Sequence, residues 1–215
     1  MVVFKGGVEI MPSRYIEGDL FDHDYDHSCP TVIAHVANDE GVMGKGFVVP
    51  LAQHFPWAKE AYVNWFKDNP LQCDTEILGE VGSPSRGQTQ MVTVKRSDQA
   101  LPPTPDEIES FRTDSNWEDR IVVANMVAQD LGSARPLYYN DLARCMDQVA
   151  NSREIVDGGG EIICPMFGSG LASGDWNFIE QLIVDCWLKR DIDVTVYYFE
   201  KFLPDNWSLP KPMQK

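Results

Sequence analysis

Two glycine-rich loops are the places where this sequence is best suited to chemistry. Each follows an apolar, strand-like stretch and precedes an amphipathic helix; the first segment spans residues 31–55 and the second spans residues 161–190. A glycine loop at the carboxyl end of a strand lets backbone N–H groups approach an anion, and the positive end of the next helix adds to the attraction. Two such loops therefore predict a diphosphate that is held from both sides.

The overall composition limits what the chain can bind. With 215 residues and a hydrophobic fraction of 43%, we expect one substantial core and a single domain over residues 1–215. The formal net charge of −15 argues against binding long nucleic acid, which needs a basic surface. A small anionic ligand is compatible with this charge, because backbone amides and helix N-termini hold a diphosphate locally.

The sequence lacks the signals of secreted and membrane proteins. The N-terminal apolar run is too short for a signal peptide and no stretch is long enough to cross a bilayer, which predicts a soluble, cytoplasmic protein with no membrane partner. The cysteines are odd in number and include no CxxC pair, so we expect them to be reduced and structural, without a disulfide framework or a zinc site. They are Cys29, Cys73, Cys145, Cys164 and Cys186.

The elements that position the two loops are short apolar stretches alternating with helical patterns. The predicted strands are 14–16, 32–37, 91–94, 121–128, 162–165 and 194–199, and the predicted helices are 46–54, 57–68, 140–156 and 175–190. Such alternation predicts a parallel or mixed sheet with helices on both faces. Residues 82–118 are rich in proline, glycine and serine, which predicts a surface excursion, and the tail 201–215 is too proline-rich for a long helix.

The last predicted helix is the best-marked element. Phe178, Leu182, Ile183 and Cys186 recur at helical spacing, which predicts that they share the buried face. Asp175 or Asn177 is expected to cap the start of the helix, and Asn177 with Glu180 fits a capping box. As a cap, Asp175 is less suited to act as an acid near the second loop.

Several ordered motifs together resemble a known family. They are GDLF at 18–21, AHVAN at 34–38, GVMGKG at 41–46 and GSGL at 168–171, shortly before Asp175 and Trp176. Each motif is weak by itself, but the ordered set resembles a macrodomain, a module that binds ADP-ribose, over roughly residues 15–199. The resemblance is closest to the branch of ADP-ribose 1''-phosphate phosphatases and terminal ADP-ribose glycohydrolases. It implies a three-layer α/β/α fold with a central mixed sheet and a ligand crevice at the carboxyl ends of the strands.

The resemblance assigns the adenine end of the ligand to three residues. Asp19 would accept a hydrogen bond from the adenine amino group, with Leu20 beside it as a ligand contact, and a turn after Gly18 is the alternative role for Asp19. Phe199 matches the position where the family places a residue against the adenine ring. Core packing is the alternative for this aromatic side chain.

The resemblance assigns the ribose and the phosphates to the two loops. Asn38 would reach the distal ribose hydroxyls, and the backbone of the first loop would wrap the ribose and phosphates; a flexible turn is the alternative for its glycines. Ser169 sits in no nucleophile elbow, so its hydroxyl is expected to contact phosphate. The first loop contributes Gly41, Gly44, Lys45 and Gly46, and the second contributes Gly168, Ser169, Gly170 and Leu171.

His35 is the residue expected to be catalytic. It lies three residues before Asn38, and the phosphatase and glycohydrolase branch has a histidine at the matching position. A neutral imidazole there could activate water for attack on a terminal phosphate, or attack phosphorus itself. A hydrogen-bonded core histidine is the alternative, and the choice depends on which face of the strand His35 occupies.

The chain departs from the glycohydrolases at two positions. Glutamate-linked glycohydrolases and DNA-directed antitoxins of the family carry a lysine after the central strand, where this chain has Ala128 and Gln129. Protein glycohydrolases carry an aspartate after the Gly-Leu of the second loop, where this chain has Ala172. Gln129 could orient a ligand or a water but cannot form a Schiff base. These departures favour phosphate removal, or binding alone, over glycohydrolysis.

The resulting expectation is an enzyme that removes the terminal phosphate of ADP-ribose 1''-phosphate without a metal or another cofactor. The run of aspartates and histidines at 22–27 has no metal-scaffold spacing and predicts a polar loop. One alternative is a non-catalytic reader of ADP-ribose, free or on macromolecules. Another is a hydrolase that removes ADP-ribose or an acetyl group from ADP-ribose adducts.

Overall fold

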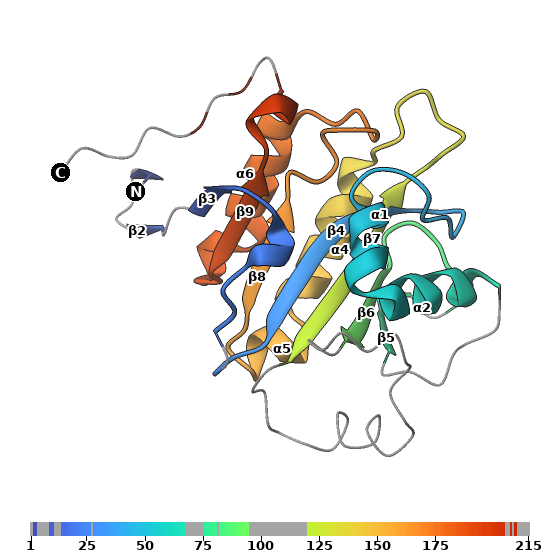
Figure 1. Ribbon diagram of the computed structural model, residues 1–215, viewed down its shortest axis with the longest axis horizontal. Coiled ribbons are helices and arrows are strands. Elements are labelled where there is room, and N and C mark those ends of the chain that lie inside the picture. Colours follow the sequence, from blue (N-terminus) through green and yellow to red (C-terminus); the bar gives the residue numbers. More distant parts are fainter. Residues whose placement is uncertain are drawn as a thin grey trace.

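A seven-stranded mixed sheet forms the centre of the molecule (Figure 1). The computed structural model describes residues 2–3, 9–10, 14–26, 28–67, 75–80, 82–94, 120–204, 207 and 209. In the sheet, the strand order is β3-β9-β8-β4-β7-β6-β5, and the first five of these run parallel, whereas β6 is antiparallel to both of its neighbours. The strands are β3 (Arg14–Glu17), β4 (Thr31–Asn38), β5 (Thr75–Leu78), β6 (Thr89–Val94), β7 (Ile121–Gln129), β8 (Glu161–Pro165) and β9 (Val194–Tyr198).

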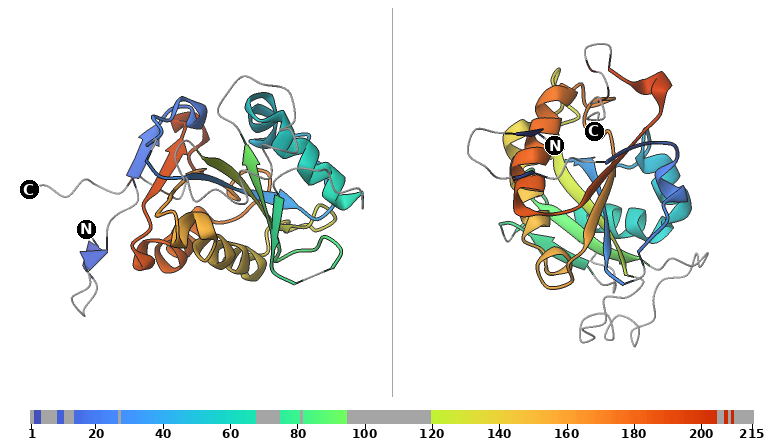
Figure 2. Two further views of the ribbon diagram at one scale, coloured as in Figure 1. Left: turned by 90° about the horizontal axis from the view of Figure 1, so that it is seen from below. Right: turned by 90° about the vertical axis from the view of Figure 1, so that its left-hand side faces the viewer.

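Helices cover both faces of this sheet, as Figure 2 shows from two sides. On one face, α1 (Val48–His54) and α2 (Pro56–Phe66) pack on a core that includes Ile33 and Val123. On the other face, α4 (Tyr139–Ala150) and α6 (Trp176–Cys186) pack on Val32 and Val122. The buried strands are predominantly apolar because both of their faces are covered. The three-layer α/β/α fold expected from the sequence is therefore confirmed.

The remaining elements are short. They are the antiparallel pair β1 (Val2–Val3) and β2 (Glu9–Ile10), helix α5 (Arg153–Val156), and three 3-10 turns, η1 (Leu20–Asp22), η2 (Leu188–Arg190) and η3 (Glu200–Phe202). Within the part of the chain that the structure describes, no helix is long and apolar enough to cross a bilayer. The cysteines within it, Cys29, Cys145, Cys164 and Cys186, are free thiols, and Cys73 lies outside the described residues.

All six predicted strands are present to within one or two residues at each end, but the sequence reading missed β5. That strand lies at the edge of the sheet, and its half-exposed TEIL sequence shows no clear apolar alternation. The predicted helix 140–156 is interrupted at Asn151 and Ser152 between α4 and α5, and the predicted helix 175–190 ends at Cys186 before η2. Of the predicted surface excursion, residues 95–118 lie outside the described part, and so does most of the tail.

The buried face of α6 differs from the predicted one. Trp176, Ile179 and Ile183 are buried, whereas Phe178 is 50% exposed, with its ring 4.6 Å from the ring of Tyr139 in an edge-to-face arrangement. Ile183 is buried as predicted, but the prediction was wrong for Phe178 because it left out Trp176, the largest fully buried side chain of the helix. Asp175 is the N-cap and accepts from the Asn177 N–H at 3.0 Å, so the capping box on Asn177 and Glu180 is not formed.

Candidate functional site

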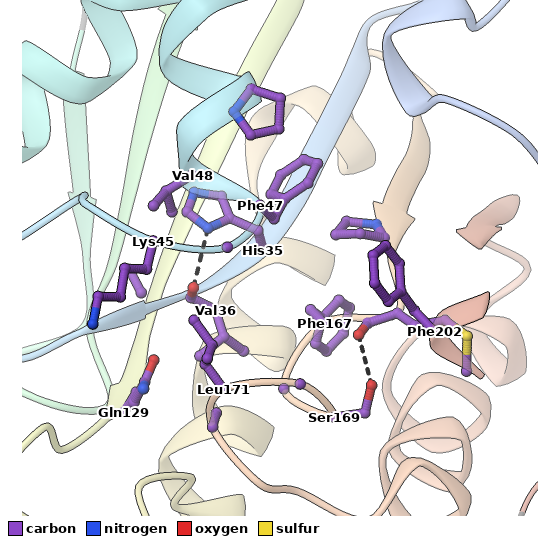
Figure 3. A pocket seen from close by; sticks show the side chains of 18 of the residues that line it. His35, Val36, Lys45, Phe47, Val48, Gln129, Phe167, Ser169, Leu171 and Phe202 are labelled. Atoms are coloured by element: carbon purple, nitrogen blue, oxygen red, sulfur yellow. Dashed lines mark hydrogen bonds between the residues drawn. The ribbon is translucent and has the colours of Figure 1, made fainter. Parts of the chain in front are cut away.

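An open cleft of about 1060 Å³ lies across the carboxyl ends of β4, β7, β8 and β9. The two glycine-rich loops form its opposite walls, and η1 closes one end (Figure 3). Every residue predicted to bind a ligand lines this cleft except Gly41. The predicted residues brought together are Asp19, Leu20, His35, Asn38, Gly44, Lys45, Gly46, Gln129, Gly168, Ser169, Gly170, Leu171 and Phe199.

Gly41 has a structural role that the sequence reading did not foresee. Its φ is +70°, and a Cβ added there would lie 2.5 Å from Cβ of Phe66 on α2. Glycine is therefore required because the loop backbone presses against this helix. The predicted wrapping of a ribose by Gly41 does not fit this place, since the residue is buried outside the cleft lining.

The end of the cleft assigned to adenine is built by η1 and the segment after β9. Asp19 is exposed, and its carboxylate caps η1 by accepting from the Phe21 N–H at 3.1 Å. Phe199 is 44% exposed, and its ring lies 6.3 Å from the ring of Phe202. A side chain this exposed contributes little to the core, so the core-packing alternative for Phe199 is not supported.

Asn38 organises its own loop. Its side-chain oxygen accepts from the N–H groups of Glu40 and Val42 at 3.1 and 3.2 Å, and its side-chain nitrogen donates to the Val42 carbonyl at 2.5 Å. The Tyr62 hydroxyl of α2 donates to the Asn38 carbonyl. The contact of Asn38 with a distal ribose stays a prediction, and it would require these loop hydrogen bonds to be shared or exchanged.

The polar groups of the two walls differ in the hydrogen bonds that they already form within the protein. In the second loop, the Ser169 hydroxyl donates to the Met166 carbonyl at 2.9 Å, so only its oxygen lone pairs remain to accept (Figure 3). In the same view Lys45 and Gln129 lie together, away from Phe202. Lys45 is exposed and, of the residues that line the cleft, it is the only lysine or arginine.

His35 occupies the floor of the cleft, with its ring between β4 and the start of α1. The side chain is 1% exposed and its ring lies 5.7 Å from the ring of Phe47. Nε2 lies 2.6 Å from Oδ1 of Asn125, and Nδ1 lies 3.1 Å from the Val36 carbonyl. Burial lowers the pKa of His35 from its ordinary value, opposed by these two hydrogen bonds. The imidazole is therefore neutral at pH 7, as a general base must be.

Acidic groups surround the cleft beyond Asn38 and Gln129, and one arginine balances them. Arg86 Nη1 lies 2.7 Å from Oδ2 of Asp39 and 2.9 Å from Oδ2 of Asp130. Its Nε is 3.5 Å from Oδ2 of Asp141, and its guanidinium stacks on Tyr138 at 4.3 Å. Burial is the largest single effect on the pKa of Arg86 and lowers it, but Asp39 and Asp130, with Tyr138, together outweigh burial and hold this pKa above its ordinary value. Arg86 thus ties the ends of β4 and β7 together.

Within the run at residues 22–27, two hydrogen bonds hold the His23 ring. His23 Nε2 lies 2.9 Å from Oε1 of Glu161, and Nδ1 lies 2.7 Å from the Tyr197 hydroxyl; His27 lies outside the described residues. Within the described ranges no group of three or more His, Cys, Asp or Glu side chains is arranged to hold a metal ion.

The sequence reading missed the apolar part of the cleft. Phe47, Phe202, Val42, Leu131 and Pro136 all line it, as does Phe21, whose ring stacks on His54 at 4.2 Å. Phe21 lies within the GDLF motif and Phe47 directly follows Gly46, so closeness to the quoted motifs was the available signal. Phe202, Leu131 and Pro136 had no such signal, because only the fold brings them to the cleft.

The fold and the cleft define a three-layer α/β/α protein with an open binding site at the carboxyl ends of its parallel strands. A macrodomain protein from Streptomyces coelicolor superposes on 86% of this chain and 97% of its own, with a TM-score of 0.58 and 27% identity. In its fold and its ordered motifs the chain is similar to macrodomain proteins, as the sequence indicated. Thermosipho africanus DarTG, solved in complex with ADP-ribose, matches 89% of this chain and 43% of its own with a TM-score of 0.55; at 15% identity it shows the fold alone.

Similarity to a curated protein is weaker. An ADP-ribose 1''-phosphate phosphatase of Lodderomyces elongisporus is 26% identical over 109 residues, which is 51% of this chain. The match spans 66% of that phosphatase, slightly less than two thirds of its length. No protein-family model matches the chain.

Proposed function

We propose that the cleft binds ADP-ribose or its 1''-phosphate. The observation that carries this proposal is that the two glycine loops and the Asp19 turn, distant in sequence, line one cleft of about 1060 Å³, the size of a site for a small-molecule ligand. The complex of Thermosipho africanus DarTG with ADP-ribose supports the ligand class. In this assignment Asp19 and Phe199 hold adenine, and the loops hold the diphosphate between them.

The proposed reaction is hydrolysis of the terminal phosphate of ADP-ribose 1''-phosphate. Water attacks phosphorus while His35 takes its proton, the bond between phosphorus and the 1''-oxygen breaks, and that oxygen takes up a proton to give ADP-ribose and inorganic phosphate. The similarity to the Lodderomyces elongisporus phosphatase and the neutral imidazole at the cleft floor support this reaction. Because His35 is 1% exposed, the reaction requires Phe47 and the first loop to move enough to admit the phosphate.

Calorimetric titration with ADP-ribose tests the binding proposal. Asp19→Ala removes both the adenine contact and the cap of η1, whereas Asp19→Ser keeps a capping oxygen that is too short to reach a ligand. We expect both variants to lose affinity about tenfold or more, equal to the loss of one hydrogen bond to a charged group. If the folded wild type does not bind ADP-ribose, the proposed function is abandoned.

Phosphate release from ADP-ribose 1''-phosphate tests the reaction, with His35→Gln as the diagnostic variant. We expect a rate at least a hundredfold lower, because a general base contributes about 10² to 10⁴, with ADP-ribose affinity nearly unchanged. Release at the wild-type rate by His35→Gln would exclude His35 from the chemistry.

A second candidate function is an ADP-ribose reader without turnover. The observation that favours it is the burial of His35, whose two ring nitrogens both have hydrogen-bond partners within 3.1 Å. In that case wild type would bind ADP-ribose tightly and release no phosphate, and His35→Gln would change stability alone.

A further inference from the structure

Helix α2 packs against the first glycine loop and holds it at three places. The Tyr62 hydroxyl donates to the Asn38 carbonyl at the end of β4, and Cβ of Phe66 lies 2.5 Å from where a Cβ on Gly41 would stand. Met43 lines the cleft, yet it is 6% exposed and packs in a small apolar cluster with Tyr62. One helix therefore supports the whole segment from Asn38 to Met43.

Asn38 lies at a break in the register of the sheet. Ala37 pairs with Val127 but Asn38 pairs with Gln129, so β7 carries one extra residue, Ala128, at this point. Bulges of this kind change the direction of the side chains around them and are frequent beside functional sites. This one places Asn38 opposite Gln129, and both residues line the cleft.

The hydrogen bond between Tyr62 and Asn38 can run in one direction only. A carbonyl oxygen only accepts, so the Asn38 carbonyl requires the phenol hydrogen. Burial, followed by the charge of Asp39, raises the pKa of Tyr62, so the hydroxyl keeps this hydrogen at neutral pH. Phenylalanine would fill the same apolar space beside Trp65 and Phe66, so packing of the ring does not by itself call for a hydroxyl.

The side chain of Asn38 depends on how its main chain is held. Its amide oxygen accepts from the N–H groups of Glu40 and Val42 at 3.1 and 3.2 Å, and its amide nitrogen donates to the Val42 carbonyl. One residue thus carries both the carbonyl that Tyr62 fixes and the side chain that shapes the loop. Without the hydroxyl, the Asn38 peptide is free to rotate, and its side chain then no longer meets both N–H groups.

We propose that Tyr62 is a positioning residue for the end of the cleft assigned to the distal ribose, because its hydroxyl fixes the Asn38 carbonyl at the bulge and so holds the Asn38 side chain in the cleft wall. The positioning of Asn38 stands on the geometry, and its effect on ligand affinity rests on the proposed function. The part of the loop assigned to the phosphates follows Met43, whose own burial anchors it. That part is expected to stay in place when the hydroxyl is lost.

Amide hydrogen exchange followed by NMR tests the positioning without any ligand. Tyr62→Phe keeps the ring and removes only the hydroxyl, so we expect the N–H groups of Glu40 and Val42 to exchange about fivefold faster, the factor that corresponds to one hydrogen bond. Tyr15→Phe is the matched control, because the Tyr15 hydroxyl donates to Oε1 of Glu180 and Tyr15 does not line the cleft. It should leave both rates unchanged. Unchanged rates in Tyr62→Phe would overturn the inference.

Calorimetric titration with ADP-ribose and with ADP tests the effect on binding. ADP lacks the distal ribose, so a general loosening of the protein would weaken both ligands alike, whereas a displaced Asn38 weakens ADP-ribose alone. For Tyr62→Phe we expect the affinity for ADP-ribose to fall about fivefold and the affinity for ADP to stay within about twofold. In an Asn38→Ala background, Tyr62→Phe should change the affinity for ADP-ribose less than about twofold, because the side chain that it positions is gone.

The outcomes separate this inference from the proposed function. If wild type does not bind ADP-ribose but Tyr62→Phe speeds exchange at Glu40 and Val42, the positioning of Asn38 stands and the proposed function fails. If wild type binds ADP-ribose and Tyr62→Phe lowers the affinities for ADP-ribose and ADP equally, or lowers neither, the role of Tyr62 is overturned and the proposed function stands.

Discussion

Leu171 lies against Gly46 across the cleft: its Cδ1 would be 3.3 Å from a Cβ added to Gly46. The two glycine loops therefore touch each other, although one follows β4 and the other follows β8. Leu171 itself is 64% exposed. The separation of the two loops therefore depends on the Leu171 side chain and on the lack of a side chain at Gly46.

Gly46→Ala is expected to weaken ADP-ribose binding. Gly46 has φ of +75°, and the left-handed conformation costs a residue with a Cβ about 1–2 kcal/mol, which is about a tenfold loss of affinity if the loop relaxes away. Calorimetric titration checks this. Adding Leu171→Ala removes the 3.3 Å contact but leaves the strained φ, so the double variant should recover only part of the affinity.

Gly41→Ala is expected to destabilise the fold by more than backbone strain alone. Its Cβ would meet Phe66 at 2.5 Å, so about 3 kcal/mol or more is expected from strain and overpacking together. Gly159→Ala is the matched control, since Gly159 has φ of +61° but nothing within 4 Å of its added Cβ. Equal losses in urea unfolding for both variants would contradict the role given to Phe66.

Arg86→Gln is expected to lower the free energy of unfolding by about 1–2 kcal/mol, because charge-assisted hydrogen bonds are lost and aspartates are left facing each other. Because Asp39 and Asp130 directly follow Asn38 and Gln129, ADP-ribose affinity should fall as well. Asp39→Asn combined with Arg86→Gln should restore part of the stability. The single variant should also gain stability from 1 M NaCl, which screens like charges; no gain would mean that repulsion is unimportant there.

Stability should fall as pH drops below about 6.5, the ordinary pKa of histidine, partly because of His35. Burial lowers the pKa of His35 in the folded state, so between that pKa and 6.5 the unfolded chain binds a proton that the folded chain does not. The unfolding free energy therefore decreases from pH 7.5 to pH 5.5. His35→Gln should lose less over this range. An equal loss in both proteins would show that His35 does not titrate in this way.

Trp207→Ala is expected to destabilise the fold by about 2–4 kcal/mol, as for other large aromatic truncations at partly closed sites. Trp207 is 9% exposed, its ring lies 5.1 Å from Tyr15, and its Nε1 donates to Oε2 of Glu180 at 3.0 Å. Trp207→Phe should lose only about 1 kcal/mol, the value of the hydrogen bond. Thermal unfolding measures the stability of both variants. An unchanged melting temperature for Trp207→Ala would show that this contact adds no stability.

The alternation of short apolar strands with helices, read from the sequence, located six of the seven strands of the main sheet and its three-layer arrangement. The exception, β5, is an edge strand, where one covered face imposes too little pattern to be read. The buried face of α6 was misread because helical spacing alone allows several stripes, and only packing against β-strands selected the one containing Trp176.

The candidate site, like the fold, could be predicted only in part from the sequence. The sequence by itself determined the glycine loops, Asp19 and His35, because backbone freedom, charge and imidazole chemistry belong to residue types. Tertiary structure decided that Gly41 packs on Phe66, that Phe202 and Leu131 reach the cleft, and that Asn125 aligns with His35. These relations depend on strand register and on loops meeting across the sheet, and such distances are not encoded in local spacing.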